Sequence, residues 1–415
     1  MGRWIEAKLW DVCVLKTWNS KSKFLVEWWR YLVMDMWAVS EDWRNISYKK
    51  TNVSKDIIKS WELVMPKDDI WWWFIIGKVS CILEDDKYVL SDHVYKLTNL
   101  KIDWVYLQYL VNSYFVNSWI KQCMTWSAQL WISKWSVERQ DLYYPESLDE
   151  QRRIAEILST IDEAIDSTQA LIDKHEQIKE GMMHDLFTRW VDPATGSLRP
   201  HPSDAPELYK DSELGLIPKE WEVVQINDVL KNIIDYRGKT PTKTKDWIPL
   251  ITAKNVRMWY VDYSEMEYIA NAGYSKWMTR WIPNKWDVLF TTEAPCWFVA
   301  SLDRDDKVAF AQRVIILQTN ESYNPYYLKY RLISKFFQNY LDSKVTGSNV
   351  KWIQSKKFIL FNIAVSKSSK EQELLYQCLD KKNLLINSLQ KQKQKLLLQK
   401  QWLMDDLLSG EVRVM

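Results

Sequence analysis

The spacing of apolar residues changes along the chain and predicts two kinds of structure. Residues 1 to about 145 contain short apolar runs, such as 30–34 and 87–90, separated by turn-forming residues. This pattern predicts a β-rich domain with one or two helices near residues 105–118. From Ser147 to Arg189, apolar residues recur every three or four positions, which predicts a long amphipathic helix. Ser147 followed by Glu150 fits a capping box at its start.

The second half of the chain repeats this order. Residues 191–219 are rich in Pro, Ser, Asp and Gly and predict an exposed linker. Strand-like runs resume at Trp221, a helical stretch follows near residues 325–343, and residues 368–409 predict a second long helix. The pattern predicts an α+β fold with five segments: a first β-rich domain at 1–145, helix 1 at 146–190, a linker at 191–220, a second β-rich domain at 221–366 and helix 2 at 367–415.

The apolar faces of the two long helices form near-heptad seams. Helices of about 40 residues are each about 60 Å long, and matching seams favour antiparallel pairing that holds the two domains at opposite ends. A generic packing or dimerisation helix is the alternative for either helix alone. The predicted seam consists of Ile154, Leu158, Ile161, Ile165, Ile172, Leu375, Leu379, Ile386, Leu389 and Leu396.

An internal repeat supports the pairing. Glu150-Gln151 recurs 221 residues later as Glu371-Gln372. The same separation of 221 residues, here called the repeat offset, relates Leu158 to Leu379. The register continues without a gap to Asp185-Leu186 and Asp406-Leu407. Two similar copies predict a pseudo-twofold arrangement.

Composition narrows the possible chemistry. The 415 residues carry 56 basic and 54 acidic side chains, so contact with nucleic acid has to come from local patches. Five scattered cysteines and four separated histidines predict neither a metal cluster nor a disulfide framework. No apolar run reaches the ~18 residues of a membrane span. We therefore expect a soluble, cytoplasmic protein without a metal.

Tryptophan and glycine usage is abnormal. The chain has 26 Trp and 9 Gly, whereas average usage gives roughly 29 Gly at this length. At the repeat offset Gly181 matches Trp402, and Trp126 matches Gly347. Only glycine reaches positive φ without steric cost, so no physical rule makes the two residues equivalent.

Our interpretation is that the source decodes UGA as glycine and that the sequence writes Trp at those codons. A genuinely Trp-rich surface is the alternative. The recoding hypothesis predicts that most tryptophans lie in loops or at element ends, many poorly buried, whereas Trp221 packs well because it follows a proline turn and begins a strand.

With glycine restored, the sequence resembles the DNA specificity subunit of type I restriction-modification systems. The order of parts matches over nearly the whole chain, although each motif is short. The matching segments are residues 148–154, 192–196, 216–221, 249–257, 287–295, 346–351 and 403–410.

This resemblance implies a non-catalytic reader of double-stranded DNA. Each β-rich domain of such a subunit contacts one half of a split target, and the helix pair sets the spacer and docks two methyltransferase subunits. Restriction subunits join some of these complexes. S-adenosylmethionine, ATP and Mg²⁺ are expected on the partner subunits and no cofactor on this chain, where we find no glycine-rich phosphate loop and no catalytic carboxylate–histidine cluster.

Polar and basic loop residues are the candidates for DNA contact, because Lys and Arg bind phosphates whereas Arg, Asn and Gln also read base edges. A solvated surface charge is the alternative for each one. The candidates are Asn19, Ser20, Lys21, Lys23, Ser127 and Gln129 in the first domain, and Arg237, Lys239, Thr240, Thr242, Lys243, Lys245, Lys254, Asn255, Arg257, Ser348, Asn349 and Lys351 in the second.

Two other functions remain open at this point. If the tryptophans are genuine, a carbohydrate- or ligand-binding protein is one alternative, although that function needs Trp gathered at one or two sites. A coiled-coil adaptor joining unrelated domains is another, which the similarity of the two halves disfavours.

Overall fold

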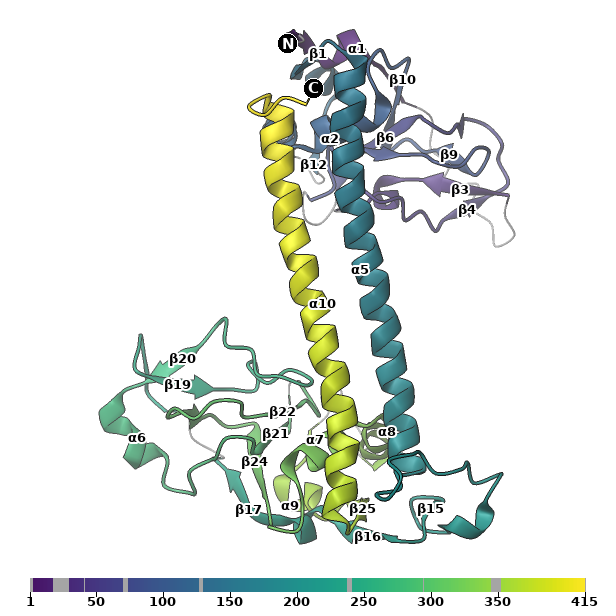
Figure 1. Cartoon of the computed structure of the whole chain (residues 1–415). Helices are drawn as coiled ribbons and strands as arrows, with labels where there is room; N and C mark the ends of the chain where they lie inside the picture. The colour runs from purple at the N-terminus through teal and green to yellow at the C-terminus, as the bar shows by residue number, and fades with distance from the viewer. Residues whose placement is uncertain are drawn as a thin grey trace. The chain divides into compact units, whose positions relative to one another are not determined.

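The computed structural model describes residues 3–17, 30–40, 42–69, 74–126, 130–236, 241–293, 295–344 and 352–414. The chain divides into two compact units: unit 1 is residues 1–170 with 390–415, and unit 2 is residues 171–389. Each unit contains a β-rich domain and a part of each long helix (Figure 1).

Unit 1 is built on a four-stranded sheet of order β2-β10-β6-β8 and a second of order β4-β3-β9-β5, with a three-stranded β11-β12-β7 sheet and the β1-β13 pair. Its strands are β1 Trp4–Lys8, β2 Val14–Lys16, β3 Tyr31–Met34, β4 Lys50–Thr51, β5 Ile57–Ile58, β6 Leu63–Pro66, β7 Asp68–Asp69, β8 Ser80–Cys81, β9 Tyr88–Leu90, β10 Val94–Thr98, β11 Thr125–Trp126, β12 Leu130–Trp131 and β13 Asp141–Pro145. Its short helices are α1 Leu9–Val12, α2 Trp104–Asn112, α3 Tyr114–Gln122 and α4 Lys134–Glu138, with the 3-10 turn Met36–Ala38.

Unit 2 repeats much of this plan with sheets of order β17-β24-β21-β22 and β18-β20-β19-β23 and the pairs β16-β25 and β14-β15. Its strands are β14 Tyr209–Lys210, β15 Ile217–Pro218, β16 Trp221–Gln225, β17 Leu230–Asp235, β18 Lys243–Thr244, β19 Ile248–Ile251, β20 Glu267–Ile269, β21 Val288–Thr291, β22 Val299–Ser301, β23 Ala309–Phe310, β24 Val314–Thr319 and β25 Asn362–Ser366. Its short helices are α6 Asn271–Trp277, α7 Pro325–Ile333, α8 Lys335–Lys344 and α9 Ser355–Phe358, with the 3-10 turns Pro206–Leu208 and Ile226–Val229.

The helical stretch predicted in each domain is a pair of helices broken at a serine. Ser113 ends α2 and caps α3, and its counterpart at the repeat offset, Ser334, ends α7 and caps α8. Each hydroxyl donates to the carbonyl three residues earlier, Leu110 O and Arg331 O, at 2.7 Å. This local hydrogen bond competes with the helix ladder, which is why the chain turns there.

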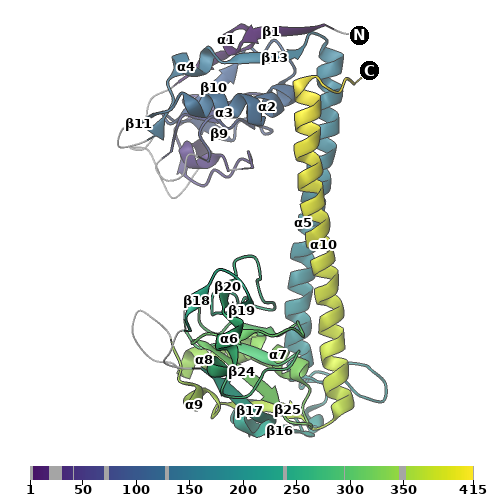
Figure 2. The same cartoon turned by 90° about the vertical axis from the view of Figure 1, so that its left-hand side faces the viewer.

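The two long helices are α5, Leu148–Thr188, and α10, Ser369–Ser409, of 41 residues each, and they run side by side in both views (Figures 1 and 2). Within unit 1, Lys400 Nζ of α10 lies 2.7 Å from Asp162 Oδ1 of α5. Seven residues further along α5 and seven back along α10, Lys393 Nζ donates to Gln169 Oε1 at 2.6 Å. The helices are therefore antiparallel there, in a heptad register. The α+β prediction, with two β-rich domains and two long antiparallel helices, is confirmed.

The predicted seam positions are buried or half-buried, and at its ends the seam joins the cores of the domains, to which the partner helix also contributes. Ile154 and Leu158 belong to the core of the unit 1 domain, and Leu375 and Leu379 to that of the unit 2 domain. Between these ends the remaining seam positions are buried (Ile165, Ile172, Ile386) or half-buried (Ile161, Leu389, Leu396). Each long helix therefore begins as part of its domain's core.

The described tryptophans occupy both exposed and buried positions. Trp221 is fully buried, but Trp190 and Trp297 are also buried, so both differ from the expected exposed loop residues. Among the tryptophans with described side chains, Trp10, Trp61, Trp119, Trp131, Trp135, Trp247, Trp281, Trp286, Trp352 and Trp402 are exposed.

Among the described residues, no helix is long and apolar enough to cross a membrane. The same residues contain no group of His, Cys, Asp and Glu side chains that could hold a metal ion.

Candidate nucleic-acid interface

Most of the predicted DNA-contacting positions lie outside the described residues. These are Asn19, Ser20, Lys21, Lys23, Ser127, Gln129, Arg237, Lys239, Thr240, Ser348, Asn349 and Lys351. The described candidates are all in the unit 2 domain, on or next to the sheet β18-β20-β19-β23.

The first described group surrounds β18. Thr242, Lys243 and Lys245 are exposed. Lys243 Nζ lies 2.8 Å from Glu267 Oε1 of the neighbouring strand β20. Because Glu267 partly neutralises the charge of Lys243, Lys245 is the better candidate of the two lysines to bind a phosphate.

The second group follows β19, and one of its members does not fit the prediction. Asn255 is buried, and its Oδ1 accepts the backbone N–H of Thr252 at 2.9 Å. Its Nδ2 donates to the carbonyls of Asp262 and Glu265 at 3.1 and 3.0 Å. The side chain holds the turn together, so the prediction that Asn255 contacts DNA is wrong. Lys254 and Arg257 are exposed on the same turn.

The two groups lie on one sheet. The backbone of Lys243 pairs with Ile269 of β20, and its Nζ reaches Glu267, which pairs with Leu250 near the end of β19 that Lys254 and Arg257 follow. Arg257 Nε lies 3.6 Å from Asp262 Oδ2. The described part of the interface consists of separate exposed cations on neighbouring turns.

Sequence reasoning missed the residues that attach each domain to its helix. Gln151 is 1% exposed; its Oε1 accepts the backbone N–H of Asp103 and its Nε2 donates to Pro145 O, both at 2.8 Å. Gln372 is 0% exposed and does the same with Asn324 N at 2.8 Å and Ser366 O at 2.9 Å.

All of these partners correspond at the repeat offset. Each glutamine bonds the first turn of a long helix to both the last strand and a helix start of its domain. The conservation of a glutamine at both Gln151 and Gln372 of the internal repeat is the sequence feature that could have identified these attachments.

The glutamates beside these glutamines have opposite environments. Glu150 forms a bidentate salt bridge with Arg413, in which Nε lies 2.7 Å from Oε1 and Nη2 lies 2.9 Å from Oε2. These hydrogen bonds lower the pKa of the Glu150 carboxyl. Glu371 is buried and accepts Trp221 Nε1 at 3.0 Å and the Ser366 hydroxyl. Because burial disfavours its charged form, the pKa of Glu371 rises to about 7.

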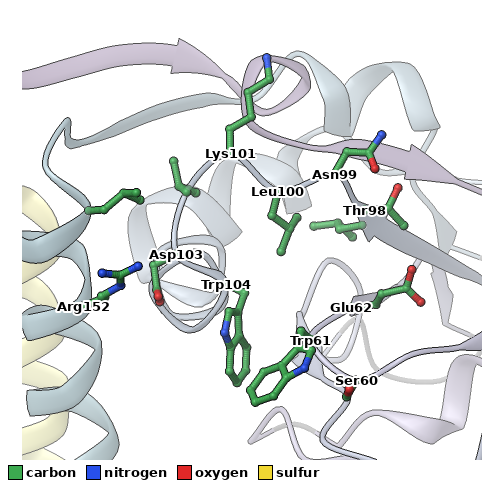
Figure 3. A pocket seen from close by; sticks show the side chains of 13 residues that line it. Ser60, Trp61, Glu62, Thr98, Asn99, Leu100, Lys101, Asp103, Trp104 and Arg152 are labelled. Carbon is green, nitrogen blue, oxygen red and sulfur yellow. The ribbon is translucent and has the colours of Figure 1, made fainter. Parts of the chain in front are cut away.

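A hollow in unit 1 is lined by Asp103, whose backbone N–H bonds Gln151 (Figure 3). Its aromatic wall is Trp61 against Trp104, with ring centroids 4.9 Å apart at 69°, and Glu62, Asp103 and Arg152 also line it. Trp61 has a φ of 70°, a conformation that favours glycine.

A family model for the type I restriction modification DNA specificity domain matches residues 1–177. The chain is 24% identical over 382 residues, 88% of its length, to the specificity subunit of the type I restriction enzyme MjaVIII from Methanocaldococcus jannaschii, of which the match covers 85%. A putative type I restriction enzyme MjaX specificity subunit from the same organism is 34% identical over 113 residues, covering 26% of this chain and 23% of that protein.

Two solved structures share the fold. The S subunit of a type I restriction-modification system from M. genitalium has a TM-score of 0.60 at 12% identity, covering 98% of this chain and 96% of that one. A chain from a structure of type I R-M complex assembly and conformational transition has a TM-score of 0.57 at 14% identity, covering 99% and 98%. The chain is thus similar over most of its length to type I restriction-modification specificity subunits, and it shares the fold of the solved structures.

Proposed function

We propose that the chain reads a split DNA target, with each β-rich domain contacting one half-site and the helix pair setting the length of the unread spacer. The recognition domains are residues 1–145 and 221–366, the helices 146–190 and 367–415, and the linker 191–220. The observation that carries the proposal is the duplicated joint: Gln151 and Gln372 attach each domain to a long helix through the same hydrogen bonds. Two identically mounted domains suit two half-sites.

Double-stranded DNA is contacted from exposed loops of both domains. Lys245, Lys254 and Arg257 are the described cations that fit this role, because their side chains are exposed. The remaining candidates are Thr242 and Lys243, together with Asn19, Ser20, Lys21, Lys23, Ser127, Gln129, Arg237, Lys239, Thr240, Ser348, Asn349 and Lys351.

The duplication also suits two copies of one partner. Two methyltransferase subunits, which bring S-adenosylmethionine, dock on the repeated units, and restriction subunits using ATP and Mg²⁺ join where the system has them. The complex acts on DNA in the cytoplasm. The chain itself holds no cofactor.

Several of the tryptophans stand for glycine in the natural protein. Trp297 (φ 66°) and Gly77 (φ 69°) illustrate this: each donates its N–H to the last residue of a strand, at Thr291 O of β21 (3.1 Å) and Pro66 O of β6 (3.0 Å). Each carbonyl accepts an amide side chain, from Gln338 at 3.3 Å and Asn117 at 3.0 Å, and these two amides correspond at the repeat offset.

The ends of the long helices provide a second such pair. The chain turns at Trp190 (φ 58°) after α5 and at Gly410 (φ 79°) after α10. A left-handed glycine is a common helix terminator, and tryptophan is a poor one. Sequencing the gene tests this: UGG codons at Trp190 and Trp297 would refute the recoding.

The function is tested by co-expression with the methyltransferase of its own gene cluster. We expect a complex that methylates one split target in a library, and DNA binding whose affinity falls steeply with salt, because phosphate contacts release counterions. Mapping the methylated sites gives both half-sites and the spacer. A chain that binds no methyltransferase, or a complex that modifies only continuous sites, would contradict the proposal.

A further inference from the structure

A three-way contact joins the unit 1 domain to both long helices. Asp162 of α5 accepts the Tyr109 hydroxyl of α2 at 2.7 Å. The same carboxylate pairs with Lys400 Nζ of α10, 2.7 Å from Oδ1. The lysine side chain is only 16% exposed, so this pair is better shielded from water than an ordinary surface ion pair.

Unit 2 contains the matching contact with the roles of the long helices exchanged. Asn383 of α10 donates from Nδ2 to the Tyr330 hydroxyl of α7 at 2.7 Å. Its Oδ1 accepts Lys179 Nζ of α5 at 3.0 Å. The repeat offset relates Tyr109 to Tyr330, Asp162 to Asn383, and Lys179 to Lys400.

The bridging residue is the part of this contact that varies between the copies. Lys179 is buried beside a neutral amide instead of a carboxylate, and desolvation lowers its pKa. Glu176 contributes a favourable charge, but the direct partner of Lys179 is an uncharged amide, which compensates the burial of the cation less well than a carboxylate does. The lysine and the tyrosine are identical in the two copies, although the cost of burying the lysine differs between them. We take this to mean that both units need a link from the tyrosine of the domain to the lysine of the second helix, whichever residue bridges them.

Each lysine contact restrains a rotation of the domain that its attachment through Gln151 or Gln372 leaves free. The joint fixes the domain at the first turn of one long helix, near Gln151 or Gln372. The lysine contact lies about three turns further along that helix, at Asp162 or Asn383, and adds the second helix. A body attached at two separated points cannot swing about either one.

We propose that Lys400 and Lys179 are positioning residues that fix the angle of each recognition domain on the helix pair and thereby determine how strictly the complex discriminates spacer length. The inference rests on the proposed function. Neither lysine touches the bases; each acts through Tyr109 or Tyr330.

The test uses the full complex with its methyltransferase and a duplex library in which both half-sites are fixed and the spacer varies by one base pair around the parental length. For Lys400→Met and Lys179→Met we expect the ratio of methylation at the parental spacer to methylation at the altered spacers to fall about tenfold. A change of that size corresponds to the loss of one hydrogen bond to a charged group. The half-site sequences stay unchanged. Lys391→Met, at an exposed position of α10, is the matched control and keeps the preference.

Conservative variants separate positioning from folding. Asp162→Asn reproduces the amide of the second copy and should retain spacer preference, whereas Tyr109→Phe and Tyr330→Phe remove a single hydroxyl and should lower it. If the lysine variants fail to assemble, these tyrosine variants decide. Unchanged spacer preference in them, or in assembled lysine variants, overturns the inference but leaves the proposed function intact. A wild-type complex that modifies no split target overturns the function itself.

Discussion

A side chain at positive φ places its Cβ against the backbone, at a cost of roughly 1–2 kcal/mol per residue. Tryptophans occupy this conformation repeatedly, and each one either strains the chain or marks a position that evolved as glycine. The positions are Trp43, Trp61, Trp190, Trp247, Trp259, Trp286 and Trp297.

The cost can be measured at Trp247, which has a φ of 102° and is 70% exposed, so little packing is lost on truncation. We expect Trp247→Gly to stabilise unit 2 by about 1 kcal/mol in denaturant unfolding. Trp131→Gly, at an exposed position in strand β12, is the control and should destabilise unit 1, because glycine in a strand costs backbone entropy. A loss of stability at Trp247 would count against the glycine interpretation.

Glu371 gives unit 2 a pH dependence of definite sign. Its pKa is about 7 in the fold against 4.5 for the ordinary group, so between these values the folded state holds a proton that the unfolded state has released. The stabilisation is therefore present at low pH and is lost as pH rises through about 7, by an amount on the order of 3 kcal/mol.

Glu371→Gln is uncharged at every pH and keeps an acceptor for Trp221 Nε1. Thermal unfolding of the two proteins between pH 5 and pH 8 should show the wild type losing stability relative to the variant. Parallel curves would rule out the buried carboxyl as the cause. Glu150, whose pKa is lowered by Arg413, should behave oppositely and contribute more at high pH.

At the scale of elements, the glutamine joints are the connections that matter most. Gln372→Ala removes the acceptor of the Asn324 backbone N–H and the donor to the carbonyls of Ser322 and Ser366. Each unsatisfied group costs about 1–3 kcal/mol. We expect unit 2 to unfold at a lower denaturant concentration, and Gln151→Ala to do the same to unit 1.

Hydrogen exchange locates the effect. In the Gln372→Ala protein, amides of the first turns of α7 and α10 should lose protection while those of unit 1 keep it. Gln377→Ala, also on α10, is the control, since its side chain bonds Glu373 of the same helix. Equal loss of protection in both variants would show that the joint adds no local stability.

The elements that the sequence predicted well are those whose signal is periodic. The long helices follow from residues repeated every three or four positions, and the second copy follows from the first at a constant offset. The serine breaks at Ser113 and Ser334 depend on one side-chain hydrogen bond, which no apolar period reports. The misassignment of Asn255 has the same origin. The side-chain amide of an asparagine in a turn can bond a DNA base or the backbone of its own turn, and the sequence does not report that this amide is buried.

Over the whole molecule, the duplication extends from helix caps to individual hydrogen bonds. Asp103 caps α2 and its counterpart at the repeat offset, Asn324, caps α7, each accepting a backbone N–H from two residues ahead. A recognition protein built this way can change one half-site by altering one domain while the mounting of the other is unaffected. Under the proposed function, the length of the spacer follows from the helix pair that carries both domains.

A paired insertion in the helices tests that dependence. Four residues placed between Ser167 and Thr168 of α5, and four between Gln394 and Lys395 of α10, lengthen both helices by about 6 Å. Both sites lie one or two residues from the Gln169–Lys393 contact, so the register continues on either side. Because base pairs rise about 3.4 Å, the spacer should grow by one or two base pairs.

Rotation favours the same outcome. Four residues turn an α-helix one full turn plus about 40°, and two base pairs turn DNA by about 70° in the same right-handed sense, so the moved domain meets nearly the same groove face. Methylation of a spacer library reads the result, and four residues inserted at Gly196 in the linker should leave the spacer unchanged. Parental spacing in the helix variant, with both half-sites still methylated, would show that the helix pair does not set the distance.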